Sequence, residues 1–261
     1  MDSAEEQRHC NMLNNLGVDI MRCGNYDLAI TAFRECMAIA RNALKRGKGE
    51  QQKLNENLQA SKESRDSETC VQLWFSSVDT VFDQQPVPAH ETISAMELDE
   101  EKSLASFFIC RSPITIPEDH SASCVTPIHA VVAMFNMALC YHIYGLEGGL
   151  GNDNIDATNP SYELLSTSAS LYRLCEEMVY LDGIGASPLF CMTLANNLGS
   201  VHSTMGSNDQ ALYCFRYLLS IQMMYVSSSN KHGPNHNVEA LNGFWSNTAR
   251  LILNNCTAPA A

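Results

Sequence analysis

The chain has 261 residues, 45% of them hydrophobic, and a formal net charge of −13. That length suffices to bury a core in one large domain or two small ones. Because an acidic surface repels phosphate groups and anionic lipids, the charge argues against nucleic-acid and membrane partners. No apolar run approaches the roughly 20 residues that cross a bilayer, and the acidic N-terminus has the pattern of neither a signal nor a transit peptide. We therefore expect a cytoplasmic or nuclear protein that is not secreted.

Eleven cysteines are scattered along the chain, and no two of them form a C-x-x-C pair. Because a zinc site needs four clustered ligands, this spacing favours reduced cysteines that serve as small core residues. His232 and His236 lie in a Gly-Pro loop where a metal would need two further ligands. The glycine run at 145–151 lacks the Lys-Ser/Thr pair of a phosphate loop. We expect no catalytic residue, no metal and no cofactor, and hence a protein that is not an enzyme.

The N-terminal region contains two helical patterns that break at Cys23-Gly24-Asn25. Apolar side chains recur every three or four residues on both sides of this break, as they do on amphipathic helices. Glycine accepts the left-handed dihedral angles that end a helix, and asparagine caps the helix that follows. Residues 3–45 are therefore predicted to form an antiparallel helical hairpin.

Residues 46–125 differ in composition from the rest of the chain. The stretch 50–126 carries 5 basic and 14 acidic residues, and such a charge excess disfavours a packed core. Two runs rich in β-branched and aromatic residues, 71–82 and 103–116, favour short strands. We predict an acidic, partly disordered insertion over 46–125 that either contains a short β-hairpin at 71–116 or is irregular.

Helical patterns resume after the insertion. A Thr-Pro pair at 126–127 and a Ser-Pro pair at 187–188 each place a capping hydroxyl before a proline at the first helical position. We predict a second hairpin, a third hairpin and a final helix, which cover residues 126–180 with a long inter-helix loop at 146–160, residues 187–226, and residues 237–254.

The first and third hairpins repeat the same small and aromatic residues without a gap. The matched pairs are Gly17 with Gly199, Gly24 with Gly206, Ala29 with Ala211, and Phe33 with Phe215. We expect the small residues to let the two helices of a hairpin pack closely, the second glycine to form the turn, and the aromatic ring to fill the space between helices.

The middle hairpin follows this pattern less closely. Its first helix places Ala138 and Gly145 at the positions of the two repeated glycines. Its second helix aligns through Ser168 and Tyr172, but only after an insertion in the turn. We therefore expect about three copies of a degenerate repeat.

The pattern resembles the tetratricopeptide repeat, whose signature of W-x-x-L-G-x-x-Y, A-x-x-x-F and P spans roughly 34 residues. The signature tryptophan and the closing proline are missing from all three copies. The resemblance implies an all-α fold, a solenoid of antiparallel helical hairpins with about three degenerate repeats and a C-terminal capping helix at 237–254, interrupted by the inserted segment. A helical bundle without repeats is the alternative.

Repeats of this family bind extended peptides or helices in a concave groove lined by their first helices. The family's groove positions, carried onto this chain, include the candidate peptide-binding residues Asn11, Asn15, Arg22, Asn136, His142, Asn196, Asn197, Ser200 and Ser203. The sixth position is asparagine in all three copies, namely Asn15, Asn136 and Asn197. A primary amide both donates and accepts, so a spaced row of asparagines can bind the main chain of an extended peptide. They can also bond to one another or to a helix backbone, and both uses stay open.

Repeats that clamp a terminal carboxylate place lysine and arginine beside asparagine, whereas these slots are Asn11, Val132 and Thr193 here. An acidic C-terminal tail is therefore not the expected ligand. The Asn-Asn-Leu sequence resembles kinesin-light-chain repeats, which bind uncharged or mixed peptides. We expect a non-catalytic adaptor or scaffold for a protein or peptide partner, with a self-associating structural module as the alternative and an enzyme as the third option. Replacing Asn136 and Asn197 by alanine should abolish partner capture and leave the helical content unchanged.

Overall fold

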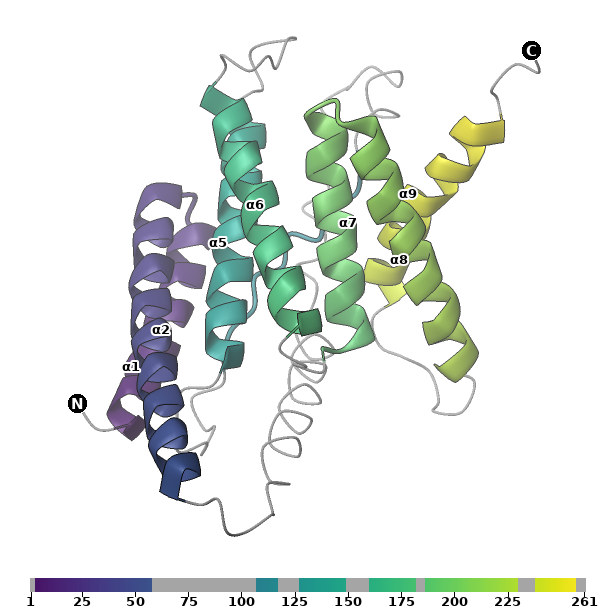
Figure 1. Ribbon diagram of the computed structural model, residues 1–261. Helices are drawn as coiled ribbons and strands as arrows, with labels where there is room; N and C mark the ends of the chain where they lie inside the picture. The colour runs from purple at the N-terminus through teal and green to yellow at the C-terminus, as the bar shows by residue number, and fades with distance from the viewer. Residues whose placement is uncertain are drawn as a thin grey trace. The chain divides into compact units, whose positions relative to one another are not determined.

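A computed structural model describes six stretches of the chain, which are residues 3–57, 107–116, 127–148, 160–181, 186–229 and 238–256 (Figure 1). The described residues form seven helices and contain no strand, which confirms the all-helical fold class. They fall into two compact units. The first unit comprises Met1–Phe75 and Pro113–Gly185, and the second comprises Ser76–Ser112 and Ala186–Ala261.

The first unit contains two helical hairpins. They are built from α1 (Ser3–Arg22), α2 (Tyr26–Asn57), α5 (Pro127–Gly148) and α6 (Pro160–Leu181). α1 pairs with α2, α5 pairs with α6, and α2 packs directly against α5. The first hairpin therefore stacks on the second, although a long insertion separates them in sequence.

The contact between the two hairpins of the first unit combines polar and aromatic groups. The Arg34 guanidinium donates to the Tyr141 hydroxyl at 2.6 Å. The rings of Tyr26 and Tyr144 stack with their centroids 5.3 Å apart. These contacts fix α5 against α2, and thereby place the polar residues of α5 beside those of α1.

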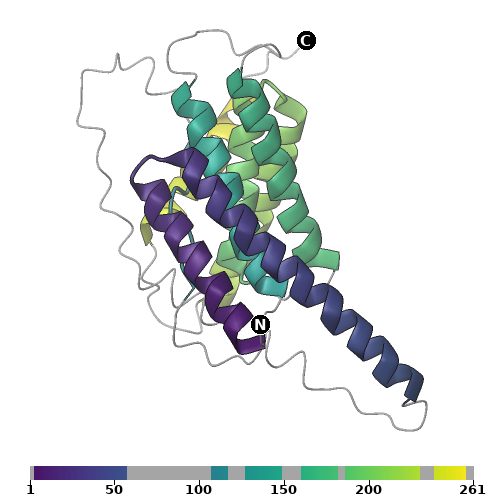
Figure 2. The same ribbon diagram turned by 90° about the vertical axis from the view of Figure 1, so that its left-hand side faces the viewer.

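α2 is longer than the sequence predicts, since the first hairpin was expected over residues 3–45 and α2 ends at Asn57. Figure 2 shows this helix, in blue, continuing past the start of α1. The residues after 45 include the good helix formers Lys, Glu and Gln, although Gly47 and Gly49 each disfavour a helix. Arg46 also forms an ion pair with Glu6 of α1, so the extension is anchored at its beginning.

The turns of the first and third hairpins are the same structure. Gly24 and Gly206 have positive φ angles of 76° and 74°. The N–H of the next residue donates back to the preceding helix in both turns, from Asn25 to the Ile20 carbonyl at 3.2 Å and from Ser207 to the His202 carbonyl at 2.8 Å. These bonds satisfy carbonyl groups that a helix end leaves unpaired, which is why the second glycine recurs.

The first glycine of the first and third copies permits close helix packing, as the repeat predicts. A Cβ atom on Gly17 would lie 2.6 Å from the Phe33 ring, and one on Gly199 would lie 2.8 Å from the Phe215 ring. Both rings are almost completely buried. No larger side chain fits at either glycine without moving a packed aromatic ring.

The middle copy corrects one part of the sequence alignment. Gly145 was aligned with the turn glycine Gly24, but it lies inside α5, which continues to Gly148. A Cβ there would approach the Leu165 side chain at 3.0 Å, so Gly145 serves helix packing and makes no turn. The alignment of the second helix fits the structure, since the Ser168 hydroxyl donates to the Ala138 carbonyl at 2.8 Å.

The second unit consists of a helical hairpin and a final helix, namely α7 (Pro188–Thr204), α8 (Asn208–Ser229) and α9 (Val238–Cys256). Ser187 caps α7, as the Ser-Pro pair predicts, and its hydroxyl accepts from the Phe190 N–H at 3.1 Å. α9 packs against α8 and α7, with Phe244 fully buried. The predicted bounds of 126–180, 187–226 and 237–254 differ from those of the helices by at most a few residues.

α5 has an unusual composition for a helix of a repeat. By length and hydropathy alone, Pro127–Glu147 is apolar enough to cross a membrane. The sequence-based expectation that no apolar run is long enough to do so was therefore wrong. However, 89% of this apolar stretch is buried inside the protein, and the core helix of a folded domain can be equally long and apolar. Packing on both sides therefore accounts for its composition.

Cysteines in the described residues behave as small core side chains. Most of them are free and buried, and Cys23 is exposed. Several other predictions concern residues outside the described stretches: the apolar run at 71–82, the histidines at 232 and 236, and most of the loop at 146–160. The described part of the expected β-hairpin, residues 107–116, is neither helix nor strand.

Candidate functional site

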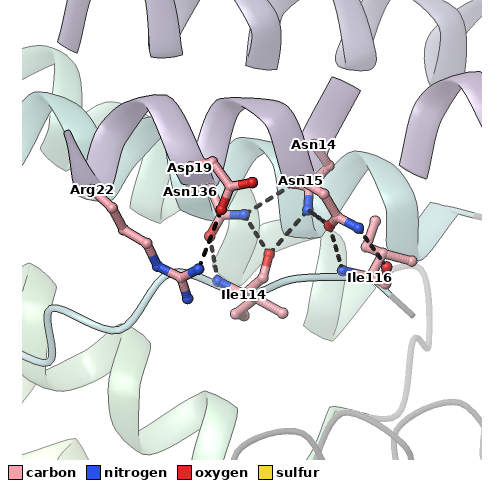
Figure 3. A network of polar contacts seen from close by, with 7 residues as sticks. All are labelled: Asn14, Asn15, Asp19, Arg22, Ile114, Ile116 and Asn136. Atoms are coloured by element: carbon pink, nitrogen blue, oxygen red, sulfur yellow. Dashed lines mark hydrogen bonds and ion pairs between the residues drawn. The ribbon is translucent and has the colours of Figure 1, made fainter. Parts of the chain in front are cut away.

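Residues 107–116, which we call the inner segment, are bound along their main chain by asparagine side chains. In the first unit, Asn15 of α1 holds Ile116. The Ile116 N–H donates to Asn15 Oδ1 at 2.8 Å, and Asn15 Nδ2 donates to the Ile116 carbonyl at 2.8 Å. We call such a pair of hydrogen bonds between one carboxamide and one residue a clamp. Figure 3 shows this clamp and its neighbours.

The second clamp of the first unit is formed by Asn136 of α5. The Ile114 N–H donates to Asn136 Oδ1, and Asn136 Nδ2 donates to the Ile114 carbonyl, both at 2.7 Å. Asn14 reinforces it, because Asn14 Nδ2 donates to the same carbonyl at 3.0 Å and Asn14 Oδ1 accepts from Asn136 Nδ2 at 2.9 Å. Asn14 and Asn136 are fully buried, so these bonds satisfy amide groups that water does not reach.

The second unit repeats the arrangement on another part of the inner segment. Asn197 of α7 clamps Cys110 with two hydrogen bonds of 3.0 Å. Asn247 of α9 clamps Phe108 with two hydrogen bonds of 2.8 Å. Asn196 plays the role of Asn14, since its Nδ2 donates to the Phe108 carbonyl at 3.0 Å and its Oδ1 accepts from Asn247 Nδ2 at 2.7 Å.

The clamps have the geometry of a β-ladder with one strand replaced by side chains. In an antiparallel pair, two opposed residues exchange both N–H···O=C bonds, and this recurs at every second residue. Within each unit the clamped residues are likewise two apart, at 114 and 116 and at 108 and 110. Each carboxamide supplies one donor and one acceptor, as a peptide group does. The site therefore suits an extended main chain.

Three of the four clamped residues of the inner segment also bury their side chains. Ile114 and Ile116 are 2% and 0% exposed, and Cys110 is 7% exposed. Burial raises the pKa of the Cys110 thiol above its ordinary value, although the N–H of Ser112 and the Thr193 hydroxyl act in the opposite direction. Buried aliphatic side chains at clamped positions add hydrophobic free energy to the main-chain bonds.

Aromatic contacts hold the start of the inner segment in the second unit. The Phe107 ring stacks on Phe215 with centroids 5.0 Å apart, and the Phe108 ring meets Phe244 edge to face at 5.8 Å. The guanidinium carbon of Arg250 lies 5.8 Å above the Phe107 ring. Gly243 of α9 lies directly against Phe108, where a Cβ atom would overlap the ring. The segment thus completes the core of this unit.

Four of the nine predicted groove residues contact the inner segment, namely Asn15, Asn136, Asn196 and Asn197. The other five predicted residues have different surroundings. Asn11 is buried with its Oδ1 unpartnered, and Arg22 forms an exposed ion pair with Asp19 at 3.4 Å. His142 is buried against the Tyr172 ring, and Ser200 and Ser203 accept hydrogen bonds through their main-chain carbonyls.

Sequence reasoning left Asn247 out of the site and treated its helix only as a cap. A signal for it exists in the repeat signature. When Asn247 is placed at the sixth position of a fourth copy, Trp245 falls on the signature tryptophan and Ala249 on the small residue. α9 is therefore the first helix of a further half-repeat, and it forms a clamp as α1, α5 and α7 do.

Comparison with known proteins agrees with this architecture. Residues 10–47 match the family model of the tetratricopeptide repeat. Over residues 10–47, this chain is therefore similar to tetratricopeptide-repeat proteins. The matched region covers most of α1 and the following part of α2, and the third hairpin has the same packing residues as this region. Neither the curated proteins nor the solved structures provide a match. Since repeats of this family serve as interaction modules, a general role in protein–protein interaction follows.

Proposed function

We propose that this protein is a non-catalytic adaptor that captures an extended segment of a partner protein with its clamp asparagines, Asn15, Asn136, Asn197 and Asn247. The observation that carries the proposal is the repetition of one clamp at equivalent positions of four helices. A helical core needs no such row, because helices satisfy their own main-chain groups. Within each unit, two such carboxamides bind residues two apart, a spacing that is suited to another main chain.

The chemistry of the clamps favours certain ligands. A carboxamide is uncharged, so the clamps give no Coulombic reward to an acidic tail. Arg22, the positive residue that the sequence placed in the groove, is engaged with Asp19. We therefore propose an uncharged, extended protein segment as the ligand, and a cytoplasmic or nuclear location for the interaction.

The proposal is tested by removing the inner segment, so that the clamp asparagines can bind an added peptide. In the full chain, residues 107–116 are replaced by a glycine-serine linker of equal length, and a synthetic peptide of sequence FFICRSPITI is added. A ligand that binds only the folded state raises the melting temperature in a concentration-dependent way. We expect a saturable rise with this peptide and none with a scrambled one. A linker variant that is folded but unaffected by the peptide would contradict the proposal.

Self-association is the second candidate, and one observation favours it. The ligand seen on the clamps belongs to this chain, so two copies that exchange their inner segments would form a dimer without new contacts. Light scattering of the intact protein and of the linker variant decides this. A dimer that becomes a monomer in the linker variant supports exchange, and a monomeric intact protein contradicts it.

A further inference from the structure

We infer that the inner segment is a tethered copy of the partner's recognition sequence and competes with the partner for the clamps. The partner segment is then extended and uncharged at its clamped positions, with an aromatic residue, a small residue and two branched aliphatic residues at the positions of Phe108, Cys110, Ile114 and Ile116. This inference rests on the proposed function and adds the ligand's chemistry and its competitor.

The aromatic position follows from the second unit. Phe108 lies against Gly243, where even a methyl group would overlap the ring, and its edge meets the Phe244 ring. Such a surface is shaped for a flat side chain. An aliphatic side chain would lose the edge-to-face contact, and a charged one would be desolvated against aromatic carbon.

The small and aliphatic positions follow from burial. Cys110 lies within the same core cluster as Met192 and Leu218, which leaves no room for a larger side chain without displacing them. Ile114 and Ile116 are enclosed in the first unit. A carboxylate at either position would lie in a dry site with no cation provided by the clamps, and its desolvation penalty would oppose binding.

Arg111 is the tolerant position among the unclamped residues. Arg111 is exposed, although it stands between clamped residues in sequence. A substitution there changes neither a clamp nor a buried contact. The recognition pattern of the second unit is therefore an aromatic residue with a small residue two positions later, and that of the first unit is two branched aliphatic residues two positions apart.

Because the inner segment is covalently joined to its own binding site, it would limit the access of a partner segment to the clamps. A segment joined to its own site competes with an effective concentration on the order of 1 mM. For a free peptide of equal intrinsic affinity near 10 μM, this competition weakens apparent binding about 100-fold. The intact protein therefore binds the free peptide far more weakly than the linker variant does.

The side-chain chemistry is tested with peptides on the linker variant. Changing the residue equivalent to Ile114 to aspartate should weaken binding at least about 100-fold, whereas the same change at the residue equivalent to Arg111 should stay within about threefold. Adding an N-methyl group at the Ile114 nitrogen removes one clamp bond and should weaken binding about tenfold or more, as a loss of 1.4 kcal/mol does. N-methylation at the Arg111 nitrogen is the matched control.

The competition is tested on the intact protein. An excess of the peptide should displace the inner segment and make Cys110 react with iodoacetamide, and mass spectrometry reads out this one thiol. Cys110 that stays protected at millimolar peptide overturns the competition. If the linker variant does not fold without peptide, Ile116→Asp in the full chain weakens the inner segment instead and should be stabilised by added peptide.

The outcomes separate the two proposals. If a folded linker variant, or the Ile116→Asp variant, does not respond to the peptide, the clamps are not a peptide site and both proposals fail. If it binds the wild-type and the Ile114-substituted peptides equally, the adaptor function stands and the inferred recognition chemistry is overturned.

Discussion

Asn136 holds Ile114 by both of its main-chain polar groups, accepting from the N–H and donating to the carbonyl at 2.7 Å. The asparagine and the isoleucine are both buried, and they are 22 residues apart in sequence. A side chain on a repeat helix thus takes the place of a neighbouring strand. The following expectations depend on that relationship and on the packing that supports it.

Asn136→Ala should lower the free energy of unfolding of the full chain by about 2–4 kcal/mol, because it leaves the Ile114 N–H and the Asn14 amide buried without their partner. Urea denaturation measures this value. Asn42 is exposed on α2, so Asn42→Ala is the matched control and should change stability by less than about 0.5 kcal/mol. Equal effects of the two substitutions would show that Asn136 carries no structural bond.

The structural role of the clamps revises one expectation from the sequence. Alanine at Asn136 and Asn197 together was expected to leave the helical content unchanged. Since both side chains hold the inner segment inside the core, we now expect a lower melting temperature by circular dichroism as well as weaker capture of the peptide.

Gly17→Ala should destabilise the protein by about 1–3 kcal/mol, because the new methyl group would overlap the buried Phe33 ring. In a Phe33→Leu background the same change should be less harmful, since the smaller side chain leaves space for it. A double-mutant cycle measures the coupling. Additive effects would mean that the glycine and the ring do not compete for space.

Gly243→Ala should destabilise the wild-type protein but stabilise a variant that lacks the Phe108 ring. In the wild type the methyl group would overlap the Phe108 ring, so stability falls and Cys110 becomes more reactive toward iodoacetamide. In a Phe108→Ala background, alanine in a helix gains up to about 1 kcal/mol over glycine. Urea midpoints of the four proteins provide the readout, and a loss of stability in both backgrounds would contradict the contact.

Stability should fall at alkaline pH. Burial, with a smaller contribution from Asp27, raises the pKa of Cys140 to about 12, and burial also raises the pKa of Cys175. Thiols of the unfolded chain release protons above about pH 8.5, while these stay protonated in the folded state. The stability is thus complete below that pH and is lost above it, by about 1.4 kcal/mol per thiol per pH unit.

Urea unfolding at pH 7.5, 9 and 10 measures the slope of this loss. The Cys140→Ala variant removes one titrating thiol and should show a shallower decline than the wild type over the same range. Identical slopes would mean that the folded and unfolded states bind protons equally at this cysteine.

Local signals in the sequence predicted the hairpins and their turns. The spacing of Gly17, Gly24 and Phe33 depends on contacts within one hairpin, so a repeat of that spacing identifies it. Gly145 was misassigned because a glycine inside a helix and one that ends it look alike without the dihedral angles. The asparagine register was likewise visible, because a poor helix former recurred at one position.

The occupant of the clamps was not predictable in the same way. Asn15 and Ile116 are 101 residues apart, and an amide that bonds to main-chain groups leaves no trace in the side chains of its partner. The inner segment was interpreted as a strand of a hairpin, whereas residues 107–116 are neither helix nor strand. Asn247 was missed because its helix was predicted only as a cap, although Trp245 and Ala249 match the repeat signature.

The most direct test of the clamps is amide hydrogen exchange of the intact protein, measured residue by residue by NMR. The account predicts slow exchange at the N–H groups of Phe108, Cys110, Ile114 and Ile116, and much faster exchange at Arg111. It also predicts that Asn15→Ala speeds exchange at Ile116 more than at Phe108. Uniform exchange along residues 107–116, or an Ile116 amide unaffected by that substitution, would contradict the claim that asparagine side chains hold this main chain.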